Sequence, residues 1–221
     1  MKKKKGKLIV FEGIDGSGKG TQAALLASRL KKEGYKVESL TFPQYGKKTA
    51  GLVEEYLAGT FGSAKEVGPY RASIFYAADR YDASRQLRKW LADGRVVVTD
   101  RYMGSNIGHQ GGKIRNTKER AKFFSWLHDL EYNVFEIPKP DAQFLMRVNP
   151  VVASALRDGR KRAKDIHEAD ERHLRDAHNA YVAAAKQFEG QFTVVKCDSG
   201  GTMRDPEDIH EEVWGYVRNL I

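Results

Sequence analysis

The chain has only one cysteine, Cys197, among its 221 residues. A lone thiol cannot close an internal disulfide, which excludes the class of small secreted domains that depend on disulfides. Because no histidine lies near it in the sequence, Cys197 is interpreted as a small core residue at the end of a strand rather than as a nucleophile.

Long apolar runs are also absent. No stretch of the sequence approaches the roughly 18 apolar residues that a membrane-spanning helix needs. The basic start MKKKKGK is followed only by LIVF, which is too short for the apolar core of a signal peptide. We therefore expect a cytoplasmic protein without a membrane partner.

The body of the chain lacks an excess of charge of either sign, although the formal net charge is +9. Five lysines within residues 2–7 and a net charge of four in residues 157–164 (RDGRKRAK) account for the whole excess. A protein that binds nucleic acid more often spreads basic residues along one face. We therefore expect no nucleic-acid partner and interpret residues 1–6 as a solvated basic tail.

The pattern of apolar residues predicts one α/β domain spanning residues 1–221. Strands are predicted at 7–11, 36–41, 95–99, 141–147 and 192–196, and helices near 19–34, 47–59, 69–93, 117–130, 150–158, 169–189 and 205–220. Gly34 and Gly94 mark helix ends, and Asp205-Pro206 marks the start of the last helix. Strands separated by helices favour right-handed crossovers and a mainly parallel sheet covered on both faces.

The most informative motif is FEGIDGSGKGTQ at residues 11–22, between the first predicted strand and the first helix. A strand that ends in a glycine-rich loop and opens into a helix is typical of a phosphate-binding P-loop. Gly13, Gly16 and Gly18 permit backbone angles that let successive N–H groups converge on phosphate oxygens. Lys19, with its ammonium end in solvent, would reach the β- and γ-phosphates of a nucleotide.

One position of this motif departs from the common pattern GxxxxGK[ST], because Gly20 follows the lysine and the hydroxyl residue Thr21 comes one place later. This GKGT variant resembles the P-loop of nucleoside monophosphate kinases and makes Thr21 the hydroxyl nearest a metal. The expected ATP-binding residues are Gly13, Asp15, Gly16, Ser17, Gly18, Lys19, Gly20 and Thr21. An ordinary glycine-rich turn between strand and helix is the alternative.

A second motif, TDRYMGSNIGHQGGK, occupies residues 99–113. Asp100-Arg101 leaves the carboxyl end of a predicted buried strand, where α/β sheets place their ligands. The acid can hold a metal-bound water or orient an attacking oxygen, and the arginine can bind a phosphate through two hydrogen bonds. Taken alone, the pair could also be an ordinary surface turn.

Together these motifs resemble those of the thymidylate kinase family. The resemblance continues through Phe42-Pro43, FYAADR at 75–80, the basic loop ending in DIHE and the segment DIHEEVW near the C-terminal end. It implies a P-loop kinase of the α/β class with a five-stranded parallel sheet, order 2-3-1-4-5, flanked by helices. A mobile lid at 157–168 and a homodimer are implied by the resemblance alone.

The activity that the resemblance implies is transfer of the γ-phosphoryl group of ATP to thymidine monophosphate (dTMP), with Mg²⁺, to give the diphosphate. ATP and dTMP are then the small-molecule partners. Two alternatives stay open. One is another nucleoside monophosphate or deoxynucleoside kinase. The other is a non-catalytic P-loop regulator with a nucleic-acid partner, for which the lysine-rich start would have to matter.

The resemblance also assigns an acceptor site. The expected dTMP-binding residues are Asp15, Phe42, Pro43, Phe75, Tyr76, Arg80, Arg101, Ser105, Asn106 and Gln110. Asp15 would meet the sugar 3′-hydroxyl, and the Phe42-Pro43 segment, where a cis peptide can occur, would wall the pocket. The stacking ring of the family lies four residues before Arg80, which selects Tyr76, with Phe75 as the alternative. His109 occupies a place often held by an aromatic ring, where it covers the sugar or only packs.

The expected catalytic residues are Lys19, Asp100, Arg101, Arg160 and Arg162. Thr21 and Asp100 are the expected metal ligands, directly or through water. Since the P-loop has no arginine of its own, the basic lid would supply the arginines that stabilise charge on the transferred phosphoryl group. Arg160 and Arg162 are preferred to the neighbouring lysines because a guanidinium fork matches phosphate better. A solvated run of charges is the alternative.

The lid hypothesis predicts that replacing Arg160 and Arg162 together by alanine slows the chemical step much more than it weakens dTMP binding. An interaction made chiefly in the transition state lowers kcat and kcat/KM together. By analogy with arginine fingers, the loss is about 10³-fold. Single-turnover kinetics measure it, and an unchanged chemical step would mean that the segment is only a solvated run of charges.

Overall fold

The computed structural model describes residues 5–158 and 171–221. Arg160 and Arg162 of the expected lid therefore lie outside the described residues. Within the described part, Gly6 is buried and donates its N–H to the Leu91 carbonyl at 2.8 Å, so the prediction that residues 1–6 are a solvated tail is wrong at Gly6. Lys7 forms an ion pair with Asp141 at 3.1 Å.

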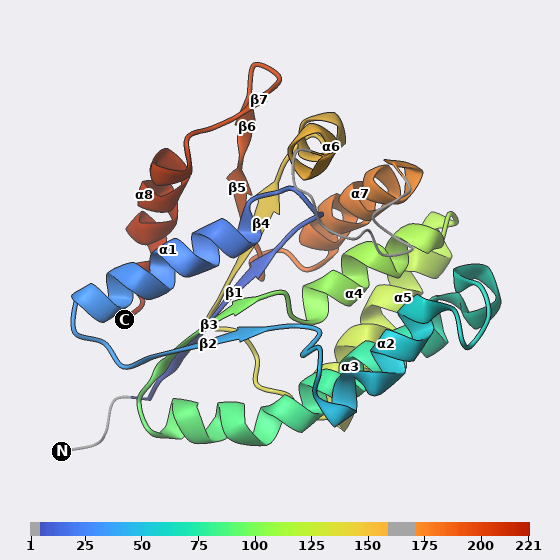
Figure 1. Cartoon of the computed structure of the whole chain (residues 1–221), viewed down its shortest axis with the longest axis horizontal. Coiled ribbons are helices and arrows are strands. Elements are labelled where there is room, and N and C mark those ends of the chain that lie inside the picture. The colour runs from blue at the N-terminus through green and yellow to red at the C-terminus, as the bar shows by residue number, and fades with distance from the viewer. Residues whose placement is uncertain (1–4, 159–170) are drawn as a thin grey trace.

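A five-stranded parallel sheet forms the centre of the molecule (Figure 1). Its strands are β1 (Lys7–Glu12), β2 (Val37–Thr41), β3 (Val96–Asp100), β4 (Ala142–Arg147) and β5 (Thr193–Lys196). The order is β2-β3-β1-β4-β5, with every neighbouring pair parallel. The predicted sheet and strand order are therefore confirmed, and all five strands were predicted to within one residue at each end.

Helices cover both faces of this sheet (Figure 1). One face carries α1 (Lys19–Lys32) and α8 (Pro206–Val217), and the other carries α3 (Ala64–Ala92), α4 (Met103–His109), α5 (Thr117–Asp129) and α7 (Glu171–Gln187). The remaining helices are η1 (Lys48–Ala50), α2 (Gly51–Ala58), η2 (Gly111–Lys113), the π-helical turn η3 (Leu130–Val134) and α6 (Pro150–Asp158). No described helix has the length and apolar character to cross a membrane.

The two faces of the central strand β1 bury two separate apolar layers. Ile9 and Phe11 pack with α1 and α8, whereas Leu8 and Val10 pack with α3, α4, α5 and α7. Successive side chains of a strand point to opposite faces, so a strand covered on both sides must be apolar throughout. This explains why KLIVFE carries no polar residue between Lys7 and Glu12.

Local signals set several helix ends as predicted. Asp205 caps α8 by accepting from the Glu207 N–H at 2.8 Å, and Pro206 fills the first helical position. Gly34 and Gly94 follow α1 and α3 with φ of 86° and 77°, values that favour glycine. Cys197 is buried directly after β5, where burial raises the pKa of its thiol to about 12.

The structure also corrects some predicted elements. The predicted helix at 69–93 begins earlier, because Ser63 and Glu66 form a capping box before a kink at Gly68. The predicted helix at 47–59 is divided into η1 and α2. The hairpin of β6 (Asp198–Ser199) and β7 (Thr202–Met203) and the turn η3 had no predicted counterpart.

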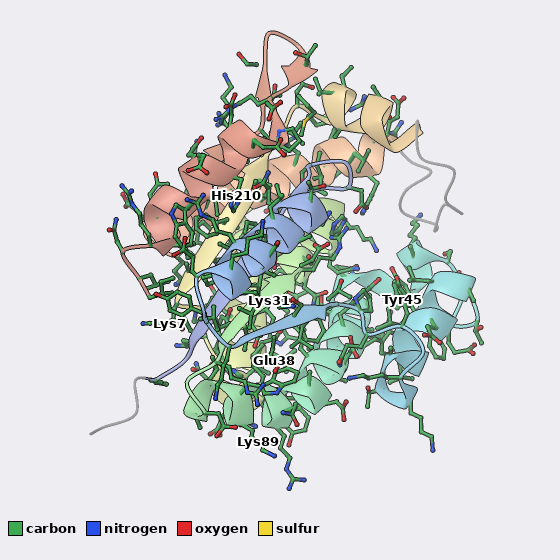
Figure 2. All side chains as sticks on the ribbon, turned by 60° about the vertical axis from the view of Figure 1, so that its left-hand side comes forward. Lys7, Lys31, Glu38, Tyr45, Lys89 and His210 are labelled. Atoms are coloured by element: carbon green, nitrogen blue, oxygen red, sulfur yellow. The ribbon has the colours of Figure 1, made fainter. Side chains whose placement is uncertain are left out.

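The carboxyl ends of the parallel strands meet at one edge of the sheet, where the two sequence motifs are brought together. Figure 2 shows Lys7 at the opposite end of β1 from this edge and Tyr45 in the segment that follows β2. The P-loop follows β1, and Asp100-Arg101 ends the neighbouring strand β3. Parallel pairing of β1 and β3 therefore places the two motifs side by side.

Candidate active site

The glycine-rich loop between β1 and α1 uses its glycines as the sequence predicted. Gly13, Gly16 and Gly18 have φ of 145°, 83° and 83°, in the region that side chains disfavour. A Cβ on Gly16 would lie 2.2 Å from the Ala153 carbonyl oxygen of α6. The loop is therefore packed directly against a neighbouring backbone, and a larger residue cannot replace this glycine without moving it.

Lys19, the first residue of α1, turns back over the loop. Its Nζ donates to the Ile14 carbonyl at 3.2 Å and to Asp15 Oδ1 at 3.3 Å. The residue is only 7% exposed, so the expectation of a solvated ammonium end is wrong. Burial, followed by repulsion from Arg101, lowers the pKa of Lys19.

Gly20 gives the GKGT variant a structural reason. A Cβ at this position would lie 2.9 Å from Asp100 Oδ2, closer than side chains approach each other. A serine or threonine directly after the lysine would therefore press on the carboxylate that ends β3, and the carboxylate would have to shift. The hydroxyl moves one place along to Thr21, which is exposed beside this contact.

Asp100 also offers a free oxygen at the same place. Its Oδ1 is buried and has no hydrogen-bond partner among the described residues. A hard cation such as Mg²⁺ prefers oxygen ligands and is commonly held by one or two carboxylates together with phosphate oxygens and water. The described residues contain no group of three or more acidic, histidine or cysteine side chains that could hold a metal alone. Asp100 and Thr21 therefore fit an ion held partly by a nucleotide.

Arg101 connects the two motifs. Its backbone has φ of 71° and donates to the Phe11 carbonyl at 2.9 Å. Its guanidinium donates to Asp15 and, at 3.3 Å, to Ser105 Oγ. Asp15 thus accepts from both Lys19 and Arg101. Burial alone would raise the pKa of Asp15, but these two cations hold it well below its usual range.

His109 completes the surroundings of Arg101. Its Nε2 lies 3.0 Å from Arg101 Nη1, and its Nδ1 lies 3.1 Å from His173 Nε2. An arginine only donates, so His109 Nε2 must accept and the ring must be neutral with its proton on Nδ1. Burial, followed by the charge of Arg101, lowers the pKa of His109. His109 therefore orients the arginine in addition to packing.

Glu12, which sequence reasoning did not select, contacts Ser105, the residue that accepts from Arg101. Its fully buried carboxyl accepts from the Tyr102 N–H and Ser105 Oγ, both at 2.7 Å, and from the Tyr181 hydroxyl at 3.2 Å. Burial raises its pKa. The only sequence signal was an acid that ends an apolar strand. Glu12 fastens the start of α4 to the strand that carries the P-loop.

A second missed acid, Glu131 on η3, holds two predicted acceptor-site residues. Arg80 donates to it from Nε and Nη2, each at 2.6 Å. Asn106 Nδ2 donates to Glu131 Oε1 at 3.2 Å and to the Ser73 carbonyl at 3.1 Å. Arg80 and Asn106 therefore meet at one buried carboxylate between α3, α4 and η3.

The segment after β2 contains the cis Phe42–Pro43 peptide. Phe42 is buried and contacts Tyr102 edge-on, with ring centroids 5.8 Å apart. The next residue, Gln44, is held by Asp79, which accepts from its N–H at 2.9 Å. Asp79 precedes Arg80 on α3, so the same helix fixes both this segment and the arginine.

The two candidate stacking rings, Phe75 and Tyr76, both contact Tyr56, at 6.1 Å and 6.2 Å between centroids. Phe75 also contacts Phe61 at 5.3 Å. Which ring stacks on a base stays a prediction. Of the other predicted residues, Gln110 is buried and accepts from Lys113 Nζ at 2.8 Å.

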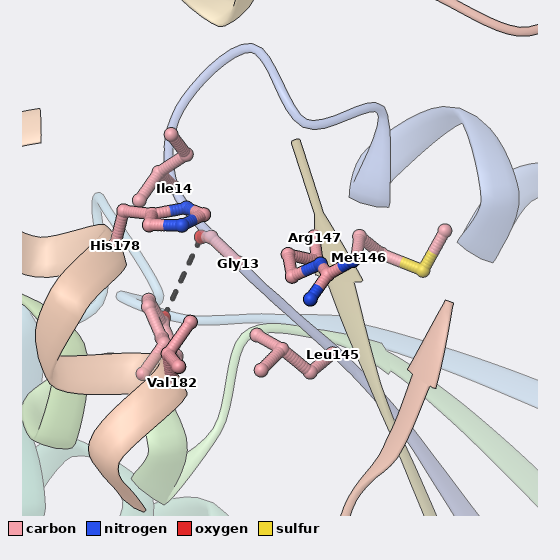
Figure 3. A pocket seen from close by; sticks show the side chains of 8 residues that line it. Gly13, Ile14, Leu145, Met146, Arg147, His178 and Val182 are labelled. Carbon is pink, nitrogen blue, oxygen red and sulfur yellow. Dashed lines mark hydrogen bonds between the residues drawn. The ribbon is translucent and has the colours of Figure 1, made fainter. Parts of the chain in front are cut away.

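A small pocket lies behind the P-loop (Figure 3). Its labelled lining residues include Gly13 and Ile14 of the loop, Leu145 of β4, and His178 and Val182 of α7. The Tyr181 hydroxyl closes one side and lies 3.5 Å from the Gly13 carbonyl oxygen. None of the predicted dTMP-binding side chains lines this pocket.

The fold and this constellation define the class of the protein. A parallel sheet of this order, with a glycine-rich loop after its central strand and an acidic–basic pair ending the adjacent strand, is that of a P-loop kinase. A family model described as thymidylate kinase matches residues 11–211. The chain belongs to the thymidylate kinase family.

Individual proteins similar to this chain also carry the name thymidylate kinase. The thymidylate kinase of Mycobacterium tuberculosis (strain CDC 1551 / Oshkosh) is 30% identical over 198 residues, covering 86% of this chain and 92% of that protein. A probable thymidylate kinase of Thermococcus gammatolerans is 32% identical, with 98% of both chains covered. The solved thymidylate kinase from Candida albicans matches the fold with a TM-score of 0.75 at 20% identity, covering 97% of this chain and 92% of that one.

The contact between Gly20 and Asp100 leads to a testable prediction. Gly20→Ala places a methyl group against the carboxylate and displaces it, which we expect to slow ATP-dependent phosphoryl transfer by about 10²-fold, the cost of a misplaced catalytic group. Steady-state kinetics measure the loss. Gly215→Ala on α8, where an added Cβ meets no atom within 4 Å, is the matched control. Equal activity of the two variants would contradict a role for this contact.

Proposed function

We propose that this protein transfers the γ-phosphoryl group of ATP to dTMP and produces ADP and thymidine diphosphate, with Mg²⁺ as cofactor. Family membership over residues 11–211 carries the proposal. The structure supports it because Lys19, Asp15, Asp100 and Arg101 gather at the carboxyl end of the sheet from two separate motifs.

The donor side is the P-loop. Its N–H groups and the amino end of α1 bind the ATP phosphates, and Lys19 contacts the β- and γ-phosphates. Thr21 and Asp100 would hold Mg²⁺, which when bound neutralises charge on the phosphate oxygens. The free Oδ1 of Asp100 supports this assignment.

The acceptor side begins at Arg101. Asp15 bonds both Lys19 and Arg101, so phosphate groups compete with Asp15 for both cations. Arg101 then binds the phosphate of dTMP, while Ser105 and His109 keep the guanidinium oriented. The Asp15 carboxylate becomes able to accept from the sugar 3′-hydroxyl.

The thymine base would lie deeper, against α3 and α4. Arg80 and Asn106 contact its polar edge, Gln110 supports the pocket, and Tyr76 or Phe75 stacks on its ring. The Phe42-Pro43 segment walls the site. Arg160 and Arg162 stabilise the transferred phosphoryl group from the lid, a proposal that rests on the sequence resemblance.

The remaining proposals concern the whole chain. We propose one catalytic unit over residues 1–221, with residues 1–6 as a basic tail and 157–168 as the lid, that assembles as a homodimer in the cytoplasm. The neutral charge balance outside the two basic segments supports the absence of a nucleic-acid partner. The closest competing function is another nucleoside monophosphate or deoxynucleoside kinase.

A panel of nucleoside monophosphates assayed with ATP and Mg²⁺ separates these functions. dTMP is expected to exceed cytidine, adenosine and guanosine monophosphates in kcat/KM. Deoxyuridine monophosphate is expected to be about tenfold weaker than dTMP, the effect of one methyl group in an apolar pocket. Preference for a purine would contradict the proposed acceptor site.

Lys19→Met tests the donor side. The substitution removes the charge but keeps much of the buried volume, so we expect phosphoryl transfer to fall by at least about 10²-fold while the protein stays folded. Lys31→Met, at an exposed position on the same helix, is the control. Turnover and circular dichroism are measured together. Near-normal turnover of a folded Lys19→Met protein would contradict the placement of Lys19 in the phosphate site.

A further inference from the structure

The buried group around Glu131 has an arrangement that the predicted roles of Arg80 and Asn106 do not explain. Glu131 is 0% exposed and Arg80 is 2% exposed. An uncompensated charge at such depth is costly, so the two 2.6 Å hydrogen bonds between them are needed to keep both charges buried. Asn106, however, is neutral and needs no ionic partner, yet it donates to the same carboxylate.

The direction of the Asn106 amide is fixed by its neighbours. Its Nδ2 faces Glu131 Oε1 at 3.2 Å and the Ser73 carbonyl at 3.1 Å. A carboxylate and a carbonyl oxygen can only accept. If the amide were turned over, its Oδ1 would face two acceptor oxygens. Both N–H groups are therefore used internally, and the group that Asn106 has left for a ligand is an acceptor, Oδ1.

Arg80, in contrast to Asn106, has a hydrogen-bond donor left for a ligand. Its Nε and Nη2 are bound to Glu131, and within residues 5–158 and 171–221 no hydrogen bond occupies its Nη1. A guanidinium only donates. Because Arg80 Nη2 and Asn106 Nδ2 share Glu131 Oε1, the two side chains are adjacent, and between them they have a donor, Arg80 Nη1, and an acceptor, Asn106 Oδ1, left for a ligand.

This pair of groups matches the edge of one kind of pyrimidine. Thymine and uracil present an N3–H donor beside the O4 acceptor, whereas cytosine presents an N3 acceptor beside an N4 amino donor. We propose that Glu131 is a specificity-determining positioning residue. By fixing the Asn106 amide and the Arg80 fork, it makes the site accept N3–H and donate to O4, and so reject cytosine. This inference rests on the proposed function, and it concerns a residue that does not touch the substrate itself.

Glu131 could instead have a purely structural role and only neutralise Arg80. A comparison of two acceptor nucleotides separates that role from a role in specificity. 5-Methyldeoxycytidine monophosphate has the size, methyl group and sugar phosphate of dTMP but the reverse hydrogen-bonding edge. For the unmodified protein we expect kcat/KM to favour dTMP by about 10⁴-fold, the discrimination of a site built to hydrogen-bond its substrate.

Glu131→Gln is the test variant. A carboxamide cannot accept from all three N–H groups that now meet the carboxylate, so either Asn106 or Arg80 loses its fixed direction. We expect the preference for dTMP over 5-methyldeoxycytidine monophosphate to fall at least tenfold, while the KM for ATP stays within about twofold. Glu131→Asp keeps an acceptor-only group and is expected to retain more of the preference than the glutamine variant. An unchanged preference in folded Glu131→Gln would overturn the inference.

If the glutamine variant does not fold, a crystal structure of the unmodified protein with dTMP decides. The inference requires Asn106 Nδ2 on Glu131 and Asn106 Oδ1 on thymine N3. An Nδ2 that faces the base would overturn it. Failure of the proposed function gives a different result: the unmodified protein then phosphorylates no thymidine monophosphate at all. If the unmodified protein uses dTMP and 5-methyldeoxycytidine monophosphate equally, the inference about Glu131 is contradicted, while phosphoryl transfer to dTMP still stands.

Discussion

The carboxylate of Asp15, shared between Lys19 and Arg101, is the interaction on which the rest of the site depends. It joins a lysine from the start of α1 to an arginine from the end of β3. Lys19 is buried, and Asp15 and Arg101 are partly buried. Each charge has a partner of opposite sign, and the two cations keep the pKa of Asp15 well below its usual range. Burial would otherwise favour the neutral carboxyl. Lys19 and the second motif are thereby held at one place.

Two further buried carboxyls extend this organisation outward. Glu12 fastens α4 to β1, and Glu131 gathers Arg80 and Asn106 between α3, α4 and η3. Each acid accepts hydrogen bonds from several elements at once, so each sets the relative position of those elements more strictly than apolar packing would. In the proposed acceptor site, the phosphate end would then depend on Asp15 and Glu12, and the base end on Glu131.

The sequence predicted the sheet order and the place of the P-loop because those features depend on local patterns. KLIVFE is apolar enough for a buried strand, and the glycines of the loop have the positive φ angles that their spacing indicated. It did not predict that Lys19 is buried, or that Gly20 lies against the Asp100 carboxylate, since those facts depend on contacts between distant segments. Glu131 comes directly after the predicted helix at 117–130, and only its position in three dimensions distinguishes it from a surface acid. The roles of individual site residues in catalysis stay predictions.

The central claim is that the two phosphate-binding motifs serve transfer between two nucleotides. Phosphorus NMR of the protein mixed with ATP, Mg²⁺ and dTMP tests it most directly, because it identifies every phosphorus-containing product. The account predicts that resonances of ADP and thymidine diphosphate grow in equal amounts as ATP and dTMP disappear. Release of inorganic phosphate from ATP while dTMP remains unchanged, or no reaction of a folded protein, would contradict it.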